Sequence, residues 1–308
     1  MEKLPLLDRA YAFFFSDQRR TLFERIILST AVVGFLIHLV WIYLIDFGWI
    51  QMEQVPALLK NPIAAAYTPF SFILVYEVYL LVYYLPRSIT TYISKQYEII
   101  TLIMIRRLFK DLASVEISPH WFEIQGDLQF TYDLVGSLLL FYLLYLFRQQ
   151  GMRRRELAAA SQDPAHSLEQ FIRLKKAIAV CLIPILFLVA SYTFITWSIG
   201  AIFPDQSIGT SFDNINHVFF DEFFGILIIV DVLLLLFSFF ITDDFHKIIR
   251  NSGFIVSTIL IRLSFSVEGL VSVALVVASV VFGLLILLIF NQYQKAQFPA
   301  QNTTGFQG

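Results

Sequence analysis

The chain has 308 residues, of which 57% are hydrophobic and only 15% charged, and its mean hydropathy is +0.70. Soluble domains carry about 25% charged residues, so this composition predicts an all-α integral membrane protein. The formal net charge of −2 gives no field that would recruit nucleic acid, and the single cysteine, Cys181, excludes an intramolecular disulfide and a cysteine metal site.

The first 20 residues are too charged and too interrupted to form a cleaved signal peptide, and we expect them to lie on the membrane surface as an amphipathic lead-in. Apolar segments follow along the rest of the chain, and a helix that spans a bilayer needs about 20 residues of this kind. In chain order they are 26–45, 69–86, 97–109, 130–147, 177–203, 223–242, 253–267 and 269–290.

Two of these segments, 97–109 and 253–267, are short and contain arginine, so they are transmembrane, re-entrant or interfacial. Lys and Arg concentrate on the cytoplasmic side of short loops, which distinguishes six spans from eight. With eight spans and a cytoplasmic N-terminus, all basic residues lie inside except Lys60, Arg106, Arg107, Lys110 and Arg262. With six spans this bias disappears. We therefore expect about eight transmembrane helices, both termini cytoplasmic, in a bacterial inner membrane.

The two halves of the chain match each other. The segment VYEVYLLVYYL around Glu77 aligns with VDVLLLLFSFF around Asp231, and EIITLIMIRRL aligns with FIVSTILIRL, which places Arg106 on Arg262. Four spans per copy is an even number, so the copies enter the membrane in the same direction, as two parallel four-helix repeats. The expected parts are a lead-in (1–20), repeat 1 (21–148), a basic cytoplasmic linker (149–172), repeat 2 (173–293) and a flexible tail (294–308).

Each repeat contains charged residues at bilayer depth, where a charge costs about 2.5 to 3.5 kcal/mol on insertion scales. These residues are the candidates for an ion pathway: Glu77, Arg106, Asp133, Asp231, Arg262 and Glu268. Opposite charges attract strongly where the effective dielectric constant is low, so we expect Glu77 to pair with Arg106 and Asp231 to pair with Arg262. His38, in the first span, is either a proton relay or a hydrogen-bonded packing residue.

These features predict an ion or proton pathway, either a channel or a secondary transporter. The alternative is a membrane scaffold or assembly partner in which the charge pairs are structural latches, because burying an ion pair need not stabilise a protein. No GxxxxGK[ST], HExxH or GxSxG motif occurs, so neither enzyme activity nor a cofactor is expected. The expected partners are the lipid bilayer, inorganic ions or protons, and a second copy or another membrane protein.

Overall fold

The computed structural model describes residues 6–50, 59, 62–112, 125–159, 166–202, 212–241, 244–267 and 269–297. Within these ranges every regular element is a helix. The helices are α1 (Leu6–Phe15), α2 (Asp17–Asp46), the short 3₁₀ helix η2 (Pro62–Ala66), α3 (Tyr67–Tyr84), α4 (Ile89–Leu112), α5 (Gln125–Ala159), α6 (His166–Ile202), α7 (Phe212–Ile241), α8 (Phe245–Ser264) and α9 (Gly269–Gln297).

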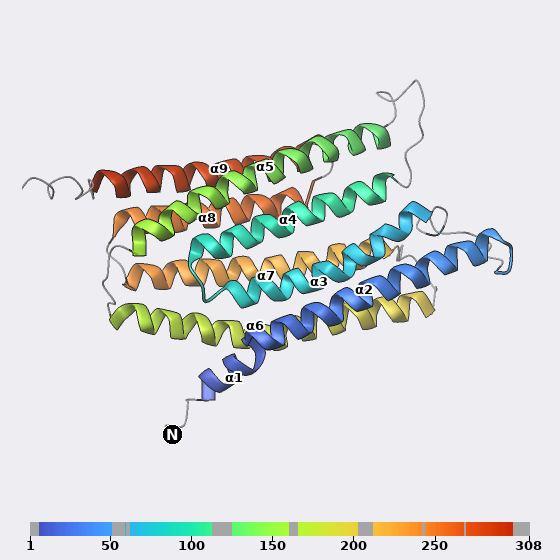
Figure 1. Cartoon of the computed structure of the whole chain (residues 1–308), viewed down its shortest axis with the longest axis horizontal. Helices are drawn as coiled ribbons and strands as arrows, with labels where there is room; N and C mark the ends of the chain where they lie inside the picture. The colour runs from blue at the N-terminus through green and yellow to red at the C-terminus, as the bar shows by residue number, and fades with distance from the viewer. Residues whose placement is uncertain are drawn as a thin grey trace, which may run out of the picture.

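The long helices run roughly along one axis and form a single bundle (Figure 1). The turn between α3 and α4, the start of α6, the connection from α7 to α8 and the end of α9 all lie at one end, on the left in Figure 1. We call this the basic end, because Arg87, Lys247, Arg250 and Lys295 belong to these segments or to the helix turns next to them. The turn between α8 and α9 lies at the opposite end.

Local signals set several helix boundaries. The Ser16 hydroxyl caps α2 by accepting the Arg19 N–H at 3.3 Å. After α2 the chain turns through Gly48, and α9 begins at Gly269; their φ angles of 73° and 71° lie in the left-handed region that only glycine adopts without strain. Pro86 follows the C-cap residue of α3, Leu85, and a helix does not readily continue through proline.

Four helices among the described residues are long and apolar enough to cross a membrane: Leu6–Asp46, Asp127–Met152, Phe223–Phe240 and Gly269–Ala296. A shorter apolar helix covers Thr68–Tyr84. The outer faces of these helices expose large hydrophobic side chains, such as Val33 on α2, Phe141 on α5 and Phe240 on α7. An exposed apolar surface of this extent suits lipid rather than water. The all-helical class predicted from composition is confirmed, and these helices indicate insertion into a membrane.

The short segments expected at 97–109 and 253–267 belong to longer helices, α4 and α8. At 1.5 Å per residue, their 24 and 20 residues correspond to about 36 and 30 Å. Helix α4 is mostly buried, whereas α8 buries one face and exposes the other, and both carry buried polar side chains, among them Gln96 on α4 and Thr258 on α8. The protein around them, rather than lipid, solvates these groups, which is why their apolar runs look too short in the sequence.

The stretch expected as a linker, 149–172, begins within α5 and ends within α6, and its residues 160–165 lie outside the described part of the chain. Helix α5 continues to Ala159 because the sequence there, MRRRELAA, consists of good helix formers. The expected tail starts inside the last turn of α9, which ends at Gln297.

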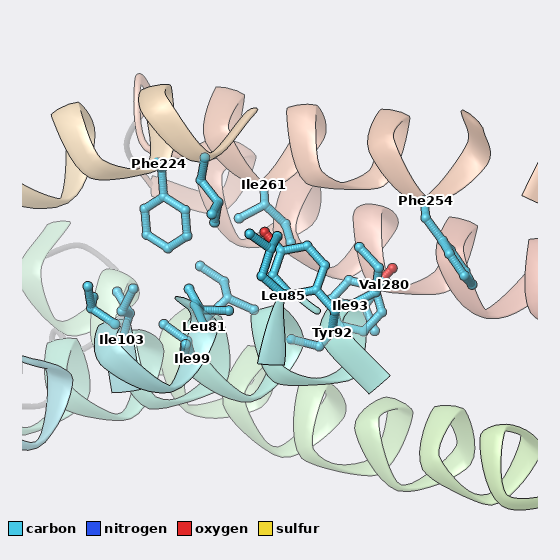
Figure 2. Packing of buried hydrophobic residues seen from close by; sticks show 14 of the residues in the cluster. Leu81, Leu85, Tyr92, Ile93, Ile99, Ile103, Phe224, Phe254, Ile261 and Val280 are labelled. Carbon is cyan, nitrogen blue, oxygen red and sulfur yellow. The ribbon is translucent and has the colours of Figure 1, made fainter. Parts of the chain in front are cut away.

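A single hydrophobic core joins the first and second halves of the chain. Figure 2 shows Leu81, Ile93 and Ile103 of α3 and α4 facing Phe224 of α7 and Ile261 of α8. Between helices in lipid, close packing provides much of the attraction, and small residues permit it. Gly136 is one of them: a Cβ added there would lie 2.4 Å from Val273 Cγ1, so the contact between α5 and α9 depends on this glycine.

Candidate functional site

Asp231 lies in the middle of α7 and points into the bundle, with only 4% of its surface exposed. Its Oδ2 accepts a hydrogen bond from Nε2 of Gln96 on α4, at 3.1 Å. The Gln96 Oε1 lies 2.8 Å from the hydroxyl of Thr258 on α8, which can donate to it. The buried Tyr92 hydroxyl also faces Asp231, without a hydrogen bond of good geometry. A carboxylate of α7 is thus tied to α4 and α8 at once.

A cation lies between this carboxylate and the basic end. Lys175, two residues before the apolar stretch 177–203, is 7% exposed and donates from Nζ to the Arg87 carbonyl at 3.2 Å. Its ammonium also lies 4.8 Å from the centre of the Phe171 ring. Burial lowers the Lys175 pKa to about 8; the repulsion of Arg250 acts in the same direction, and the attraction of Asp231 opposes both. Lys175 therefore loses its proton at a lower pH than an exposed lysine does.

A second set of buried polar side chains lies next to the hydrogen bonds of Asp231, Gln96 and Thr258. The hydroxyls of Tyr97 on α4 and Ser257 on α8 are 2.7 Å apart, and Ser257 Oγ is 3.0 Å from the Ser279 hydroxyl on α9. All three residues are fully buried. Each hydroxyl has both a donor and an acceptor role available, so the three can pass a proton or simply fix the helices in register.

Asp133 of α5 forms the polar contact nearer the opposite end. It is fully buried, its Oδ2 lies 3.8 Å from Arg107 Nε, and its Oδ1 accepts the amide of Gln129 at 2.8 Å. Arg107 also reaches the Ser272 hydroxyl of α9 at 3.4 Å. Arg107 thus forms an ion pair with Asp133 inside the bundle. The neighbouring Arg106 is 6% exposed and buried in the same part of α4.

The two expected charge pairs do not form. Glu77 is half-buried, and its Oε2 makes no hydrogen bond among the described residues. The charges that act on it most strongly belong to Lys95 and Glu98 of α4, and Arg106 is not among them. Counted from the tight turn between α3 and α4, Glu77 lies at the level of residue 96, about 15 Å along the axis from Arg106.

Asp231 is likewise bonded to Gln96 and not to Arg262. Thr258, which shares Gln96 with Asp231, marks the level of the carboxylate on α8, and Arg262 lies one turn further, about 6 Å along the axis. Glu268 lies outside the described residues.

Sequence reasoning missed the uncharged members of this site, Gln96, Tyr97, Ser257 and Thr258, together with Lys175. The signal is present in the sequence as polar residues at helical spacing along one face of an otherwise apolar helix. On α4 this face carries Thr90, Ser94, Tyr97 and Thr101, and on α8 it carries Asn251, Ser257, Thr258 and Ser264. His38 of α2, by contrast, follows the packing alternative, since its Nδ1 lies 2.5 Å from the Thr68 hydroxyl of α3.

Among the described residues, no group of three or more His, Cys, Asp or Glu side chains is arranged to hold a metal ion. No protein family, curated protein or solved structure matches the chain. The geometry described above is therefore the basis for any functional conclusion.

Proposed function

We propose that the chain is a polytopic membrane protein that conducts protons or small ions, with Asp231 as the central group of the pathway. The observation that supports this most directly is the placement of Asp231: a carboxylate in mid-helix, shielded from lipid, bonded to Gln96 and paired with no cation within 4 Å among the described residues. A carboxylate in such a position is costly in a membrane and is typical of proton relays.

The polar side chains near Asp231 follow one another along the axis of the bundle. Lys175 connects the basic end to Asp231, and Gln96 connects Asp231 to Thr258. Tyr97 and Ser257 occupy the adjacent positions on the same two helices and continue the polar line. Nearer the opposite end the line passes to Thr101, Arg106 and the pair of Asp133 with Arg107.

The proposed architecture is two four-helix repeats, α2–α5 and α6–α9, related by a pseudo-twofold axis along the membrane normal. In each set, consecutive helices pack against one another. Helices α4 and α8 contact each other, as do α5 and α9, which are the equivalent helices of the two sets. α4 begins at Ile89 and α8 begins at Phe245, a separation of 156 residues that equals the separation of Arg106 from Arg262. With eight spans the basic end is the cytoplasmic one.

Proton flux into liposomes tests this function. The purified chain is reconstituted with a pH-sensitive dye inside, and a potassium gradient with valinomycin provides the driving voltage; sodium, potassium and chloride gradients are tested in parallel. Asp231→Asn keeps the shape and one acceptor oxygen but cannot ionise, and we expect it to lower the flux at least tenfold. The matched control is Asp244→Asn, which removes an exposed acid at the start of α8.

Two results contradict the proposal: flux by the native chain that does not exceed that of empty liposomes for any ion, or flux unchanged by Asp231→Asn in a folded protein. Either result favours the scaffold alternative. That alternative has its own support, because Tyr97, Ser257 and Ser279 satisfy one another's hydrogen bonds as a structural latch would. A scaffold would retain its partner protein on purification when Tyr97→Phe and Ser257→Ala are combined.

A further inference from the structure

A cavity of about 770 Å³ opens at the basic end between α2, α3, α4 and α5. It lies apart from the buried Asp231. The charged residues that line it, among those the structure describes, are Arg20, Arg87, Lys95, Arg148, Asp17 and Glu98. Cations outnumber carboxylates in this list by two to one, so the cavity favours an anion.

Neither carboxylate forms a close ion pair with Arg20 of α2 or with Arg87. Glu98 is shared between Lys95 and Arg148, and both of these ion pairs form on the α4 and α5 side of the cavity. Asp17 accepts a hydrogen bond from the Tyr83 hydroxyl at 2.7 Å. Neither Arg20 nor Arg87 forms an ion pair within 4 Å among the described residues, although Asp17 attracts Arg20 at longer range. Both guanidinium groups therefore keep donors that an anion in the cavity can use.

These two arginines flank one aromatic ring. The guanidinium carbons of Arg20 and Arg87 lie 5.3 and 5.7 Å from the centre of the Tyr83 ring. Arg87 Nη2 donates to the Tyr83 hydroxyl at 3.3 Å, and the buried Nε of Arg20 has no hydrogen-bond partner in the part of the chain that the structure describes. Two like charges held by one ring repel each other, and an anion between them would remove the repulsion.

The first turn of α4 contributes further donors. Ser88, Thr90 and Thr91 line the cavity at the helix N-terminus, where the helix dipole is positive, and Ser88 caps the turn by accepting the Thr91 N–H at 3.3 Å. One turn on, Ser94 also lines the cavity; it is only 9% exposed, and its hydroxyl makes no hydrogen bond with any described residue. A hydroxyl that lines the cavity without a hydrogen-bond partner among the described residues, beside two guanidinium groups, is suited to an oxyanion ligand.

We propose that this cavity is a binding site for a phosphate group held by Arg20, Arg87 and Ser94 at the N-terminus of α4. Guanidinium groups match the geometry of phosphate oxygens and bind them through paired hydrogen bonds. The phosphate belongs either to a lipid headgroup or to a soluble phosphate compound. The site does not depend on the proposed ion pathway, since Asp231, Gln96 and Thr258 do not line it.

Binding is measured on the full chain in nanodiscs of phosphatidylcholine. In one arm inorganic phosphate is titrated at constant ionic strength, and in the other the discs contain increasing phosphatidic acid, whose headgroup is a phosphomonoester. The readouts are the thermal unfolding midpoint and, for the lipid arm, the lipid retained in native mass spectrometry. We expect a saturable rise of the midpoint in at least one arm, and the arm that responds identifies the source of the phosphate.

The combined change Arg20→Gln and Arg87→Gln is expected to weaken this binding at least tenfold. Arg173→Gln is the matched control, because it removes one exposed arginine from α6 outside the cavity. Ser94→Ile keeps every charge and blocks the cavity, and it should also abolish binding, which covers the case in which the double variant does not fold. Absence of saturation in both arms, equal weakening by Arg173→Gln, or native binding by Ser94→Ile would each overturn the proposal.

Discussion

The hydroxyls of Tyr97 and Ser257 lie 2.7 Å apart and join α4 to α8 at the centre of the bundle. The same Tyr97 hydroxyl fills the space beside Gly283 of α9, where an added Cβ would lie 1.8 Å from it. The buried side chain of Tyr97 therefore joins α4 to both α8 and α9, and so connects the first half of the chain to the second. The fit at this point leaves no room for an additional methyl group.

Gly283→Ala should destabilise the fold by about 1 to 3 kcal/mol, because the new methyl group would overlap the Tyr97 ring and force it or α9 to move. The measurement is the free energy of unfolding in a denaturant titration. Adding Tyr97→Phe should restore part of the loss, since it removes the oxygen but leaves the ring carbon 2.9 Å from the new Cβ.

Gly225→Ala on α7 is the control for helix propensity. A Cβ there meets nothing within 4 Å, so the change should leave stability unchanged or raise it by about 0.5 to 1 kcal/mol. Equal effects of the two substitutions would show that the close contact between Tyr97 and Gly283 has no energetic weight.

Gln96 is predicted to be more important for stability than the charge of Asp231. Gln96→Leu removes both the donor to Asp231 Oδ2 and the acceptor of the Thr258 hydroxyl. The hydroxyl can still donate to the Phe254 carbonyl, so the main loss, about 1 to 3 kcal/mol, comes from the buried Asp231 carboxylate that no longer has this donor. Asp231→Asn keeps an oxygen in place for the Gln96 amide and should cost less. Denaturant titrations of the two variants compare these losses, and a larger loss for Asp231→Asn would contradict the assigned hydrogen bonds.

Composition and apolar length predict the helices of this fold well, because a membrane allows few structures other than helices. The sequence also singles out Asp231 and Asp133 as buried acids, since a charge inside an apolar run is unusual. Their partners were not predictable in the same way. Pairing Asp231 with Arg262 requires the relative register of α7 and α8, and a shift of one turn, about 6 Å, is enough to bring Gln96 in instead.

The uncharged polar residues were missed for a different reason. Gln96, Ser257 and Thr258 are common residue types whose importance depends on burial at a contact between α4 and α8, which are far apart in the sequence. The phosphate site is hidden in the same way, because Arg20 and Arg87 lie 67 positions apart and meet only through Tyr83. In the sequence each arginine resembles an ordinary flanking residue of a transmembrane helix.

Eight spans predict which loops share a side of the membrane. In a background with Cys181→Ser, we expect Ser88→Cys and Lys247→Cys to react with a membrane-impermeant maleimide only from the cytoplasmic side. Trp49→Cys and Ser266→Cys should react only from the other side. All four positions are exposed in the fold, so a failure to label reflects the membrane and not burial. Labelling of Ser88→Cys and Trp49→Cys from the same side would rule out a spanning α3.

Stability is also predicted to depend on the protonation of Lys175. The folded chain holds the Lys175 pKa at about 8, mainly through burial, whereas the ordinary value is 10.5. Between these two values the unfolded chain binds a proton that the folded chain has released, so the free energy of unfolding should rise as the pH increases from about 8 towards 10.5. Below the folded pKa the buried ammonium is charged and this gain is absent.

Lys175→Met tests the source of that rise. The charged groups that act on Lys175 are Asp231 of α7 and Arg250 of α8, while the Arg87 carbonyl accepts its hydrogen bond. Unfolding midpoints are recorded from pH 7 to 10.5 for the native chain, for Lys175→Met and for the exposed control Arg173→Gln. The native chain and the control should gain stability over this interval and Lys175→Met should not, because methionine has no proton to release. An equal gain in all three proteins would assign the rise to other groups and remove Lys175 as the titrating residue between the basic end and Asp231.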